Sequence, residues 1–398
     1  MRARDGAGER SPARPRPERR PQGFLILSAS PGYGGAERSM EILVRHAPQD
    51  ARVTVVADSD LHLAALRRLA RPGLEIVHLD TGRPGTFGRS VAALVALFLR
   101  VKPRAVLANT HHSALLLAAA APVLRQFGAR FWLYVRDFLW LDAEAIFARL
   151  PDANVLVPSD VVLERPHYVA RHIGQARVVP DMVELGPSDG AAPAATPAAF
   201  LHLATVNAWK GHAHLLNALA LAREAGVPLK CRSRGPLGDR AVLASIETRR
   251  ASLRLGDTFE LLGYVADPVP DIRAATAVVV TSVSHSGGPE TFCRAIIEAW
   301  ACERPVIAFA AGAPAGIISH EVNGLLVPEG DDQALAAALV RLARDPALAR
   351  RLGAAGRRVA EHEYEAKMVA ARFWATLAGP AAAGAPVSAQ DAIAASLW

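Results

Sequence analysis

Two glutamates eight positions apart, Glu290 and Glu298, could hold an extended polar ligand at two points. They stand in the stretch Ser286–Ala308, whose pattern predicts a Gly-Gly-Pro loop, an amphipathic helix and a buried strand. On one continuous helix the carboxylates would lie about 12 Å apart along the axis and about 80° apart around it. That separation is too wide for a shared proton or metal ion. It suits a nucleotide diphosphate linked to a sugar, with one carboxylate on the ribose and the other at the opposite end.

The residues that follow Glu290 strengthen this interpretation. Thr291, Phe292 and Cys293 would form the first turn of the helix, where free backbone amide groups attract a phosphate. The simpler alternative is a solvated helix face, in which Glu290 complements the helix dipole and Arg294 with Glu298 forms an ordinary surface pair.

The residues downstream of Glu298 favour the ligand-binding interpretation. A Pro305-Val306-Ile307-Ala308 strand is followed by Gly312-Ala313-Pro314 and Asn323-Gly324-Leu325-Leu326-Val327. In order and spacing, this stretch resembles the nucleotide-sugar half of the family 4 glycosyltransferases. The resemblance implies the GT-B fold and transfer with retention, with Glu290 catalytic and Glu298 on the donor. One position departs, because Gly316 stands where the family usually has an acid.

Two earlier turns resemble the same family. Gly34 and Gly35 follow a predicted strand, and the resemblance implies that their backbone approaches the donor phosphate and the acceptor. Lys210 stands in a Lys-Gly-His sequence at the first turn of the second half, where the family's lysine contacts the donor diphosphate. The arginine that the family has shortly before this lysine is missing. Residues 230–236 stand where the family has a Gly-x-Gly-Pro turn, and Arg234, next to Gly235, or Arg232 is the expected substitute.

A third group of polar residues follows predicted strands of the first half. Arg136 and Asp137 occupy the place where the family often has a His-Asp pair beside the reacting sugar. Arginine can donate to a phosphate or hydroxyl group but cannot accept a proton. We therefore assign Arg136 a catalytic donor role, and His111 and Asp137 positions on the acceptor side.

Strand and helix patterns alternate along most of the chain, which predicts an α/β protein with two doubly wound, Rossmann-like domains facing a central cleft. We expect a basic, disordered tail at 1–23, an acceptor-side domain at 24–185 and a linker at 186–199. A donor-binding domain at 200–364, a helix at 365–378 that crosses back to the first domain, and a tail at 379–398 complete the chain. The predicted strands are Phe24–Leu27, Arg52–Ala57, Leu74–Leu79, Arg104–Thr110, Arg130–Arg136, Asn154–Ser159, Arg177–Pro180, Phe200–Val206, Thr258–Val265, Thr276–Ser282 and Pro305–Ala308.

The charge and the cysteines limit the partners. Residues 1–23 hold seven arginines and three acids, so +4 of the net +7 falls there and +3 on the rest. That argues against a nucleic-acid partner, while the tail could contact anionic lipid at the periphery of a membrane. Three cysteines without a CxxC pattern favour a reducing, cytoplasmic setting and no zinc site. Asp58-Ser59-Asp60 is a weak metal-binding pattern, and we expect neither a metal nor a cofactor.

These features predict an enzyme that moves a sugar from a nucleotide diphosphate sugar to a hydroxyl acceptor, which is a glycan, a lipid-linked molecule or a small molecule. Two alternatives remain. One is a sugar-nucleotide epimerase on the same fold, disfavoured by the absence of a histidine at Arg136. The other is a non-catalytic subunit that binds a sugar nucleotide, which the departures at Arg136 and Gly316 favour.

Overall fold

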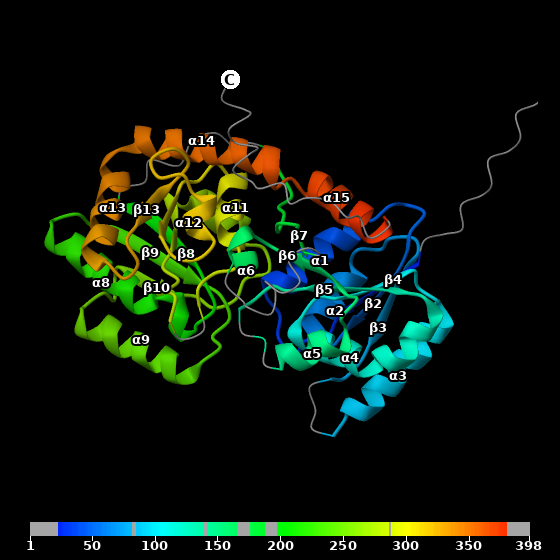
Figure 1. Cartoon of the computed structure of the whole chain (residues 1–398). Helices are drawn as coiled ribbons and strands as arrows, with labels where there is room; N and C mark the ends of the chain where they lie inside the picture. The colour runs from blue at the N-terminus through cyan, green and yellow to red at the C-terminus, as the bar shows by residue number, and fades with distance from the viewer. Residues whose placement is uncertain are drawn as a thin grey trace, which may run out of the picture.

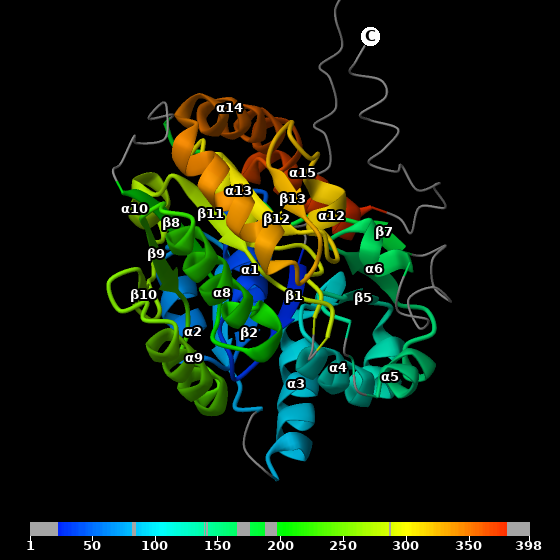
Figure 2. The same ribbon diagram turned by 90° about the vertical axis from the view of Figure 1, so that its left-hand side faces the viewer.

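Two α/β lobes lie side by side in the computed structural model, which describes residues 23–81, 85–138, 140, 142–164, 176–187, 197–285 and 288–379 (Figure 1). The predicted tails, most of the predicted linker, and Ser286 with Gly287 lie outside the described residues. Figure 2 views the pair with the second lobe in front of the first.

The first lobe is a seven-stranded parallel sheet in the order β3-β2-β1-β4-β5-β6-β7. Its strands are β1 Gly23–Ser28, β2 Arg52–Ala57, β3 Leu74–His78, β4 Ala105–Ala108, β5 Arg130–Tyr134, β6 Asn154–Val157 and β7 Ala176–Val178. Its helices are α1 Gly35–Arg45, α2 Asp60–Arg67, α3 Phe87–Val101, α4 His111–Leu124, η1 Arg125–Phe127, α5 Ala143–Arg149 and α6 Asp160–Glu164.

Helices cover both faces of this sheet, so its strands are apolar on both sides. In β1, Leu25 and Leu27 pack with α3, α4 and α5, whereas Phe24 and Ile26 face α1 and α2. This alternation follows from the two-residue period of a strand. It explains why continuous apolar runs, rather than alternating ones, marked the strands in the sequence.

The second lobe is a six-stranded parallel sheet in the order β10-β9-β8-β11-β12-β13. Its strands are β8 Ala198–Leu203, β9 Leu229–Arg234, β10 Phe259–Leu261, β11 Ala277–Val280, β12 Val306–Phe309 and β13 Leu325–Val327. Its helical segments are η3 Ala208–Lys210, α8 His212–Glu224, α9 Arg240–Ser252, α10 Val269–Ala274, α11 Arg294–Ala301, α12 Pro314–Ile317, α13 Asp332–Arg344 and α14 Pro346–Glu363. The prediction of two Rossmann-like α/β domains is confirmed.

Two boundaries differ from the prediction. Strand β8 begins at Ala198, inside the segment expected to be linker, because Ala198 and Ala199 pair in register with Leu229 and Lys230 of β9. Residues 230–234, expected to form part of a glycine turn, belong to β9, and the turn is confined to Gly235 and Pro236.

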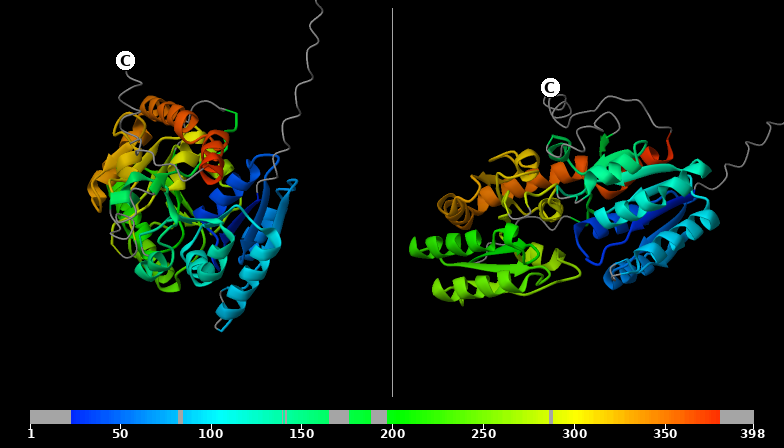
Figure 3. Two further views of the ribbon diagram at one scale, coloured as in Figure 1. Left: turned by 45° about the vertical axis from the view of Figure 1, so that its right-hand side comes forward. Right: turned by 60° about the horizontal axis from the view of Figure 1, so that its bottom comes forward.

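The last helix, α15 Ala366–Ala378, belongs in space to the first lobe. Helix α14 runs along the second lobe and α15 continues over the first (Figures 1 and 3). The buried indole of Trp374 donates from Nε1 to the carbonyl oxygen of Leu43 at 2.8 Å and meets the ring of Phe24 edge-on. The chain therefore crosses between the lobes twice, once between β7 and β8 and once between α14 and α15. No helix among the described residues is long and apolar enough to cross a membrane.

Trp374→Ala tests how strongly α15 stabilises the first lobe. Truncating a buried aromatic side chain costs about 3–5 kcal/mol, so the variant should lose about that much free energy of unfolding in urea. Arg372→Ala, at an exposed position of the same helix, is the matched control and should stay within about 0.5 kcal/mol of the parent. Equal stability of the two variants would show that α15 is not a structural part of the first lobe.

Candidate active site

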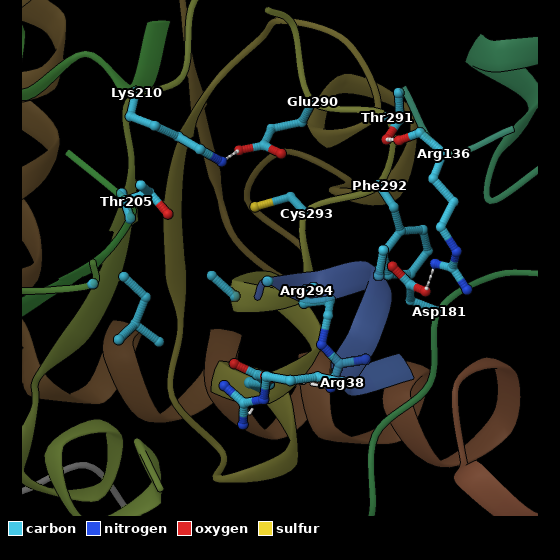
Figure 4. Close-up of a pocket in the computed structure, with 18 of the residues that line it drawn as sticks. Arg38, Arg136, Asp181, Thr205, Lys210, Glu290, Thr291, Phe292, Cys293 and Arg294 are labelled. Carbon is cyan, nitrogen blue, oxygen red and sulfur yellow. Dashed lines mark hydrogen bonds and ion pairs between the residues drawn. The ribbon is translucent and has the colours of Figure 1, made fainter. Parts of the chain in front are cut away.

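A cavity of about 340 Å³ lies between the two lobes, at the carboxyl ends of both parallel sheets. This is where ligands bind in open α/β sheets. Figure 4 shows side chains from both lobes pointing into it. The predicted site residues that line it are Gly34, Gly35, Arg136, Asp137, Lys210, Arg234, Gly235, Glu290, Thr291, Phe292, Cys293 and Glu298.

Lys210 is fixed by the turn that follows β8. Gly211 has a φ of +69°, and a Cβ there would lie 1.8 Å from the carbonyl oxygen of Thr281, so the turn requires glycine. The Thr281 hydroxyl donates to the carbonyl oxygen of Lys210 at 2.9 Å, and the amide of Val283 donates to that of Trp209 at 2.8 Å. The backbone of this turn is therefore tied to the segment after β11.

Two buried histidines support the same turn. His202 lies 3.1 Å from the hydroxyl of Ser233 through Nδ1 and 3.2 Å from that of Thr281 through Nε2. His212 meets His202 edge-on, with ring centroids 4.6 Å apart. Burial, followed by the nearby charge of Lys210, lowers the pKa of His212 to about 4. Burial also lowers the pKa of His202, so both rings are neutral near pH 7.

Lys210 and Glu290, both of the second lobe, form an ion pair at the wall of the cavity. The Lys210 Nζ atom lies 2.5 Å from Glu290 Oε1 and 3.9 Å from the centroid of the Trp209 ring. The Ser282 hydroxyl donates to the same carboxylate oxygen at 2.7 Å. The two side chains with the main predicted roles thus point toward each other in Figure 4.

The expectation that Glu290 lies in the helix is wrong. Helix α11 begins at Arg294, after Cys293 with a φ of +77°, so Glu290 to Cys293 form a loop. The backbone groups that would begin a helix bond elsewhere: the Glu290 carbonyl accepts from the amide of Ala313, and the Thr291 carbonyl accepts from the hydroxyl of Ser159. The separations calculated for one continuous helix, and the first-turn amide site, therefore do not apply.

The pair Arg294 and Glu298 is not an ordinary surface pair. Both side chains are about nine-tenths buried, and Arg294 Nη2 donates to Glu298 Oε1 at 3.1 Å. Arg294 Nη1 reaches into the first lobe, where it donates to Ser39 Oγ at 2.7 Å and to the carbonyl oxygen of Met182 at 3.0 Å. Arg38 approaches Glu298 to 3.7 Å from α1. Two guanidinium groups thus share one carboxylate between the lobes.

Arg38 is charged at neutral pH. Burial lowers the pKa of Arg38, but the nearby Glu298 carboxylate, Tyr33, Tyr264 and Glu41 together outweigh burial, so this pKa is raised. The Arg38, Arg294 and Glu298 side chains therefore carry one net positive charge at the border of the cavity, which suits an anionic ligand.

Arg136 lies at the cavity, but its side chain is held by the protein. Its Nε donates to Asn109 Oδ1 at 2.9 Å, its Nη1 lies 2.5 Å from Asp181 Oδ1, and its guanidinium stacks 3.7 Å from the centroid of the Tyr134 ring. Its carbonyl oxygen accepts from the Thr291 hydroxyl at 2.6 Å (Figure 4). This geometry fits a residue that organises the cleft floor and joins the lobes better than the catalytic donor role that the sequence predicted.

Three other predicted positions lie at the edge of the cavity or outside it. His111 does not line the cavity, because it opens α4 and faces Trp140, with ring centroids 5.8 Å apart. Arg234 lines the cavity but pairs with Asp271 at 2.9 Å, while the Arg232 side chain is 55% exposed. Gly316 lies in α12, where an added Cβ would have nothing within 4 Å, and does not line the cavity.

Several lining residues escaped the sequence analysis. Arg38 follows the Gly-Gly-Ala-Glu turn by one residue, and Asp181 directly follows the predicted strand that ended at Pro180. The strand-end rule that selected Arg136 would also have found Asp181. Tyr33 and Tyr264 face each other across the cleft with ring centroids 6.2 Å apart, a contact for which the sequence holds no signal.

Metal binding has no support in the part of the chain that the structure describes. There, no group of three or more histidine, cysteine, aspartate or glutamate side chains could hold a metal ion. Asp58 of the Asp-Ser-Asp pattern instead accepts from the amide and hydroxyl groups of Thr81, and Asp60 begins α2.

Comparison with known proteins finds a family that the second lobe resembles. Residues 190–359 match the family model described as "Glycosyl transferases group 1". The match covers less than half of the chain and falls on the second lobe. This match includes Lys210, Glu290 and Glu298, so the expected glycosyltransferase resemblance is confirmed for this half of the chain.

Two curated relatives match parts of the chain. The lipopolysaccharide core biosynthesis glycosyltransferase LpsD of Rhizobium meliloti is 32% identical over 133 residues, which are 33% of this chain and 37% of the relative. The D-inositol 3-phosphate glycosyltransferase of Frankia alni is 46% identical over 87 residues, which are 21% of this chain and 20% of the relative. The chain thus spans well under half the length of these relatives.

Solved structures match over nearly the whole length. Anabaena HepE in complex with UDP and glucose aligns with a TM-score of 0.76 at 20% identity, covering 90% of this chain and 99% of that chain. The sucrose-phosphate synthase of Thermosynechococcus elongatus aligns with a TM-score of 0.70 at 21% identity, covering 88% and 97%. These likenesses establish the GT-B fold for both lobes together.

Asp181→Asn tests the buried pair at the cleft floor. Removing one charge of a buried pair costs about 3–5 kcal/mol, so the variant should lose about that much free energy of unfolding at pH 7. Asp152→Asn, which breaks the exposed pair with Arg125, is the matched control and should cost less than about 1 kcal/mol.

The stability that the Arg136–Asp181 pair contributes should fall at low pH. Burial raises the pKa of Asp181, but the charges of Arg136 and Arg294 and the Ser39 hydroxyl outweigh burial and lower it below the ordinary value of 3.8. The stability that the pair contributes is therefore complete above about pH 4 and is lost as the pH falls through the folded-state pKa. The difference between parent and Asp181→Asn in urea titrations should shrink in that range. A difference that stays constant down to pH 2 would contradict the assignment.

Proposed function

We propose that this protein is a retaining glycosyltransferase of the family 4 type, which moves a hexose-like sugar from a nucleoside diphosphate sugar to a hydroxyl acceptor. The observation that carries the proposal is the convergence of Lys210, Glu290 and Glu298 on one cavity between the lobes, all three within a group 1 domain. The Glu290–Val327 pattern supports the family 4 and retaining assignments. HepE, solved with UDP-glucose, makes UDP the first nucleotide to test.

In this mechanism, the protein stabilises charge on the departing diphosphate. Lys210 is held by Glu290 before the donor binds, and a phosphate oxygen would take the place of that carboxylate as its partner. A positive charge that is already in place stabilises the transition state more than the bound donor, because negative charge develops on the diphosphate during the reaction. Glu290, released from Lys210, can then accept a hydrogen bond from a hydroxyl group of the sugar. We propose no protein nucleophile and no metal ion for this step.

We assign the donor to the second lobe and the acceptor to the first. The loop at Gly34 and Gly35 borders the cavity opposite Lys210, and a Cβ at Gly35 would lie 3.1 Å from the Arg294 side chain, so glycine permits the close approach of the lobes there. Asp137 is the acceptor-side residue that remains from the sequence analysis, since His111 lies outside the cavity. We propose a cytoplasmic setting, in line with the unpaired cysteines.

A panel of nucleotides tests the donor class. Thermal unfolding with UDP, GDP, ADP and TDP should single out one base, and a nucleotide at a hundred times its dissociation constant adds about 2.7 kcal/mol. Transfer from the matching sugar nucleotide, followed by the stereochemistry of the product, then tests retention. Binding without transfer to any hydroxyl acceptor would favour a non-catalytic subunit, and turnover without an acceptor would favour an epimerase.

Lys210→Met isolates the charge of the lysine, because methionine keeps most of the packing of its stem. Loss of one electrostatic stabiliser costs about 10²–10³ in rate, and the loss should fall on kcat more than on donor affinity. Lys230→Met, an exposed lysine outside the cavity, is the matched control and should leave turnover unchanged. Near-normal turnover by Lys210→Met would move the diphosphate contact to another cation, Arg234 first.

The two glutamates should separate in their effects. Glu298→Ala should weaken binding of the nucleotide itself, since Glu298 lies between Arg38 and Arg294 at the border of the cavity. Glu290→Ala should mainly lower the transfer rate, because Glu290 pairs with Lys210. Calorimetry with the nucleotide and steady-state kinetics measure the two effects, with the exposed Glu224→Ala as control. Unchanged binding and turnover in both variants would refute the roles of both glutamates.

A further inference from the structure

A chain of hydrogen bonds runs from Arg136 into the interior of the first lobe. Arg136 Nε donates to Asn109 Oδ1 at 2.9 Å, and Asn109 Nδ2 donates to Ser28 Oγ at 3.1 Å. Ser28 Oγ lies 3.1 Å from Nε2 of His62, whose Nδ1 lies 2.8 Å from Oε1 of Glu41. Asn109, Ser28 and His62 are buried, so these polar groups depend on one another rather than on water.

The other end of this chain is Tyr33, whose hydroxyl donates to Oε2 of Glu41 at 3.2 Å. Tyr33 and Arg136 both line the cavity, whereas His62 does not. A buried histidine of α2 therefore connects two side chains of one cavity through hydrogen bonds. Stability alone does not require such a chain, because well-packed apolar side chains stabilise a core as well as buried polar groups do.

The chemistry of the partners fixes the direction of the bonds at His62. A carboxylate only accepts, so Nδ1 of His62 carries a hydrogen and donates it to Glu41. The Ser28 hydroxyl already accepts from Asn109, and among the described residues its own hydrogen has no acceptor other than Nε2 of His62. His62 is therefore the tautomer with its hydrogen on Nδ1, and its ring cannot turn over without losing both bonds.

The same carboxylate fixes the hydroxyl of Tyr33. Because Glu41 can only accept, the single hydrogen of the phenol points to Oε2, and the phenol oxygen offers the cavity only lone pairs. Burial, followed by the charge of Glu41, raises the pKa of Tyr33, so the phenol keeps this hydrogen near pH 7. The Tyr33 ring also meets the rings of His62 and Tyr264, in each case with centroids 6.2 Å apart.

We propose that Tyr33 binds the acceptor of the transfer by accepting a hydrogen bond from one of its hydroxyl groups, and that His62 is a positioning residue that holds Glu41 in the place this requires. The inference rests on the proposed sugar transfer. A hydroxyl group suits Tyr33 because it supplies the hydrogen for this bond. A phosphate oxygen would meet only lone pairs there, with the Glu41 carboxylate behind them.

Tyr33→Phe isolates the hydroxyl, because phenylalanine keeps the ring contacts. Transfer is measured with methyl glucoside as the acceptor probe, and with UDP-glucose or the sugar nucleotide that the nucleotide panel selects as donor. The variant should raise KM for methyl glucoside about threefold to tenfold, which corresponds to one lost hydrogen bond. Stabilisation by the nucleotide alone should stay at the parent's level, because we assign the donor to the second lobe.

His62→Leu removes both bonds of the imidazole and should raise the same KM at least as much. The double variant of Tyr33→Phe and His62→Leu should be no worse than His62→Leu alone, because His62 acts through Tyr33. His62→Gln keeps one donor and one acceptor and should lie closer to the parent. His78→Leu, at an exposed histidine of the same lobe, is the matched control and should leave KM unchanged.

Nitrogen NMR of the full chain with isotope-labelled histidine tests the tautomer without any substrate. The His62 signals are identified by their loss in His62→Gln, and they should show the hydrogen on Nδ1 and a free lone pair on Nε2. This measurement stands even where His62→Leu fails to fold, which circular dichroism would show. A hydrogen on Nε2 alone would reverse the chain of bonds and overturn the proposal.

Three kinetic outcomes would also overturn it. One is an unchanged KM for methyl glucoside in Tyr33→Phe. Another is a double variant in which the two losses multiply, since His62 would then not act through Tyr33. The third is a loss of nucleotide binding in Tyr33→Phe, which would place Tyr33 on the donor. A parent without transfer from any sugar nucleotide would instead refute the proposed function, and the tautomer measurement would still decide whether His62 holds Glu41.

Discussion

The loop from Glu290 to Cys293 is the constraint on which the cleft depends, because its backbone and side chains are bonded to both lobes at once. The carbonyl of Glu290 is held by Ala313, within the second lobe. Thr291 accepts from Ser159 and donates to the carbonyl of Arg136, both in the first lobe. One residue later than this loop, Arg294 crosses to Ser39 and Met182. The loop that carries Glu290 thus also connects the two lobes.

The charged side chains of the cleft are paired among themselves. Lys210 faces Glu290, Arg136 faces Asp181, Arg234 faces Asp271, and Arg38 and Arg294 share Glu298. Buried charges need such partners, because removal from water is expensive. An anionic ligand must therefore exchange with a carboxylate rather than fill a vacant position. Lys210 can make this exchange because its ammonium group sits at the end of a flexible stem, whereas the Arg136 guanidinium is fixed on three sides.

Charge is also unevenly distributed on the larger scale. Residues 81–136 of the first lobe hold eight arginines and lysines and no aspartate or glutamate, whereas the carboxylates of the cleft come from both lobes. Because α3 connects the carboxyl end of β3 to the amino end of β4, it runs along the whole sheet.

The sequence by itself determined the two parallel sheets, since buried strands with helices on both faces require the continuous apolar runs seen at Phe24–Leu27 and Thr276–Ser282. The resemblance in the sequence also predicted one shared site for Lys210, Glu290 and Glu298, and all three line the cavity. Only the tertiary structure decided where α11 begins, since the Glu290 and Thr291 carbonyls bond to residues distant in sequence. It likewise decided that Arg136 is held by Asp181 and Asn109, that His111 turns toward Trp140, and that Arg38 reaches Glu298. Local pattern specifies which element a residue belongs to, whereas the partner of a charged side chain depends on how separate elements pack together.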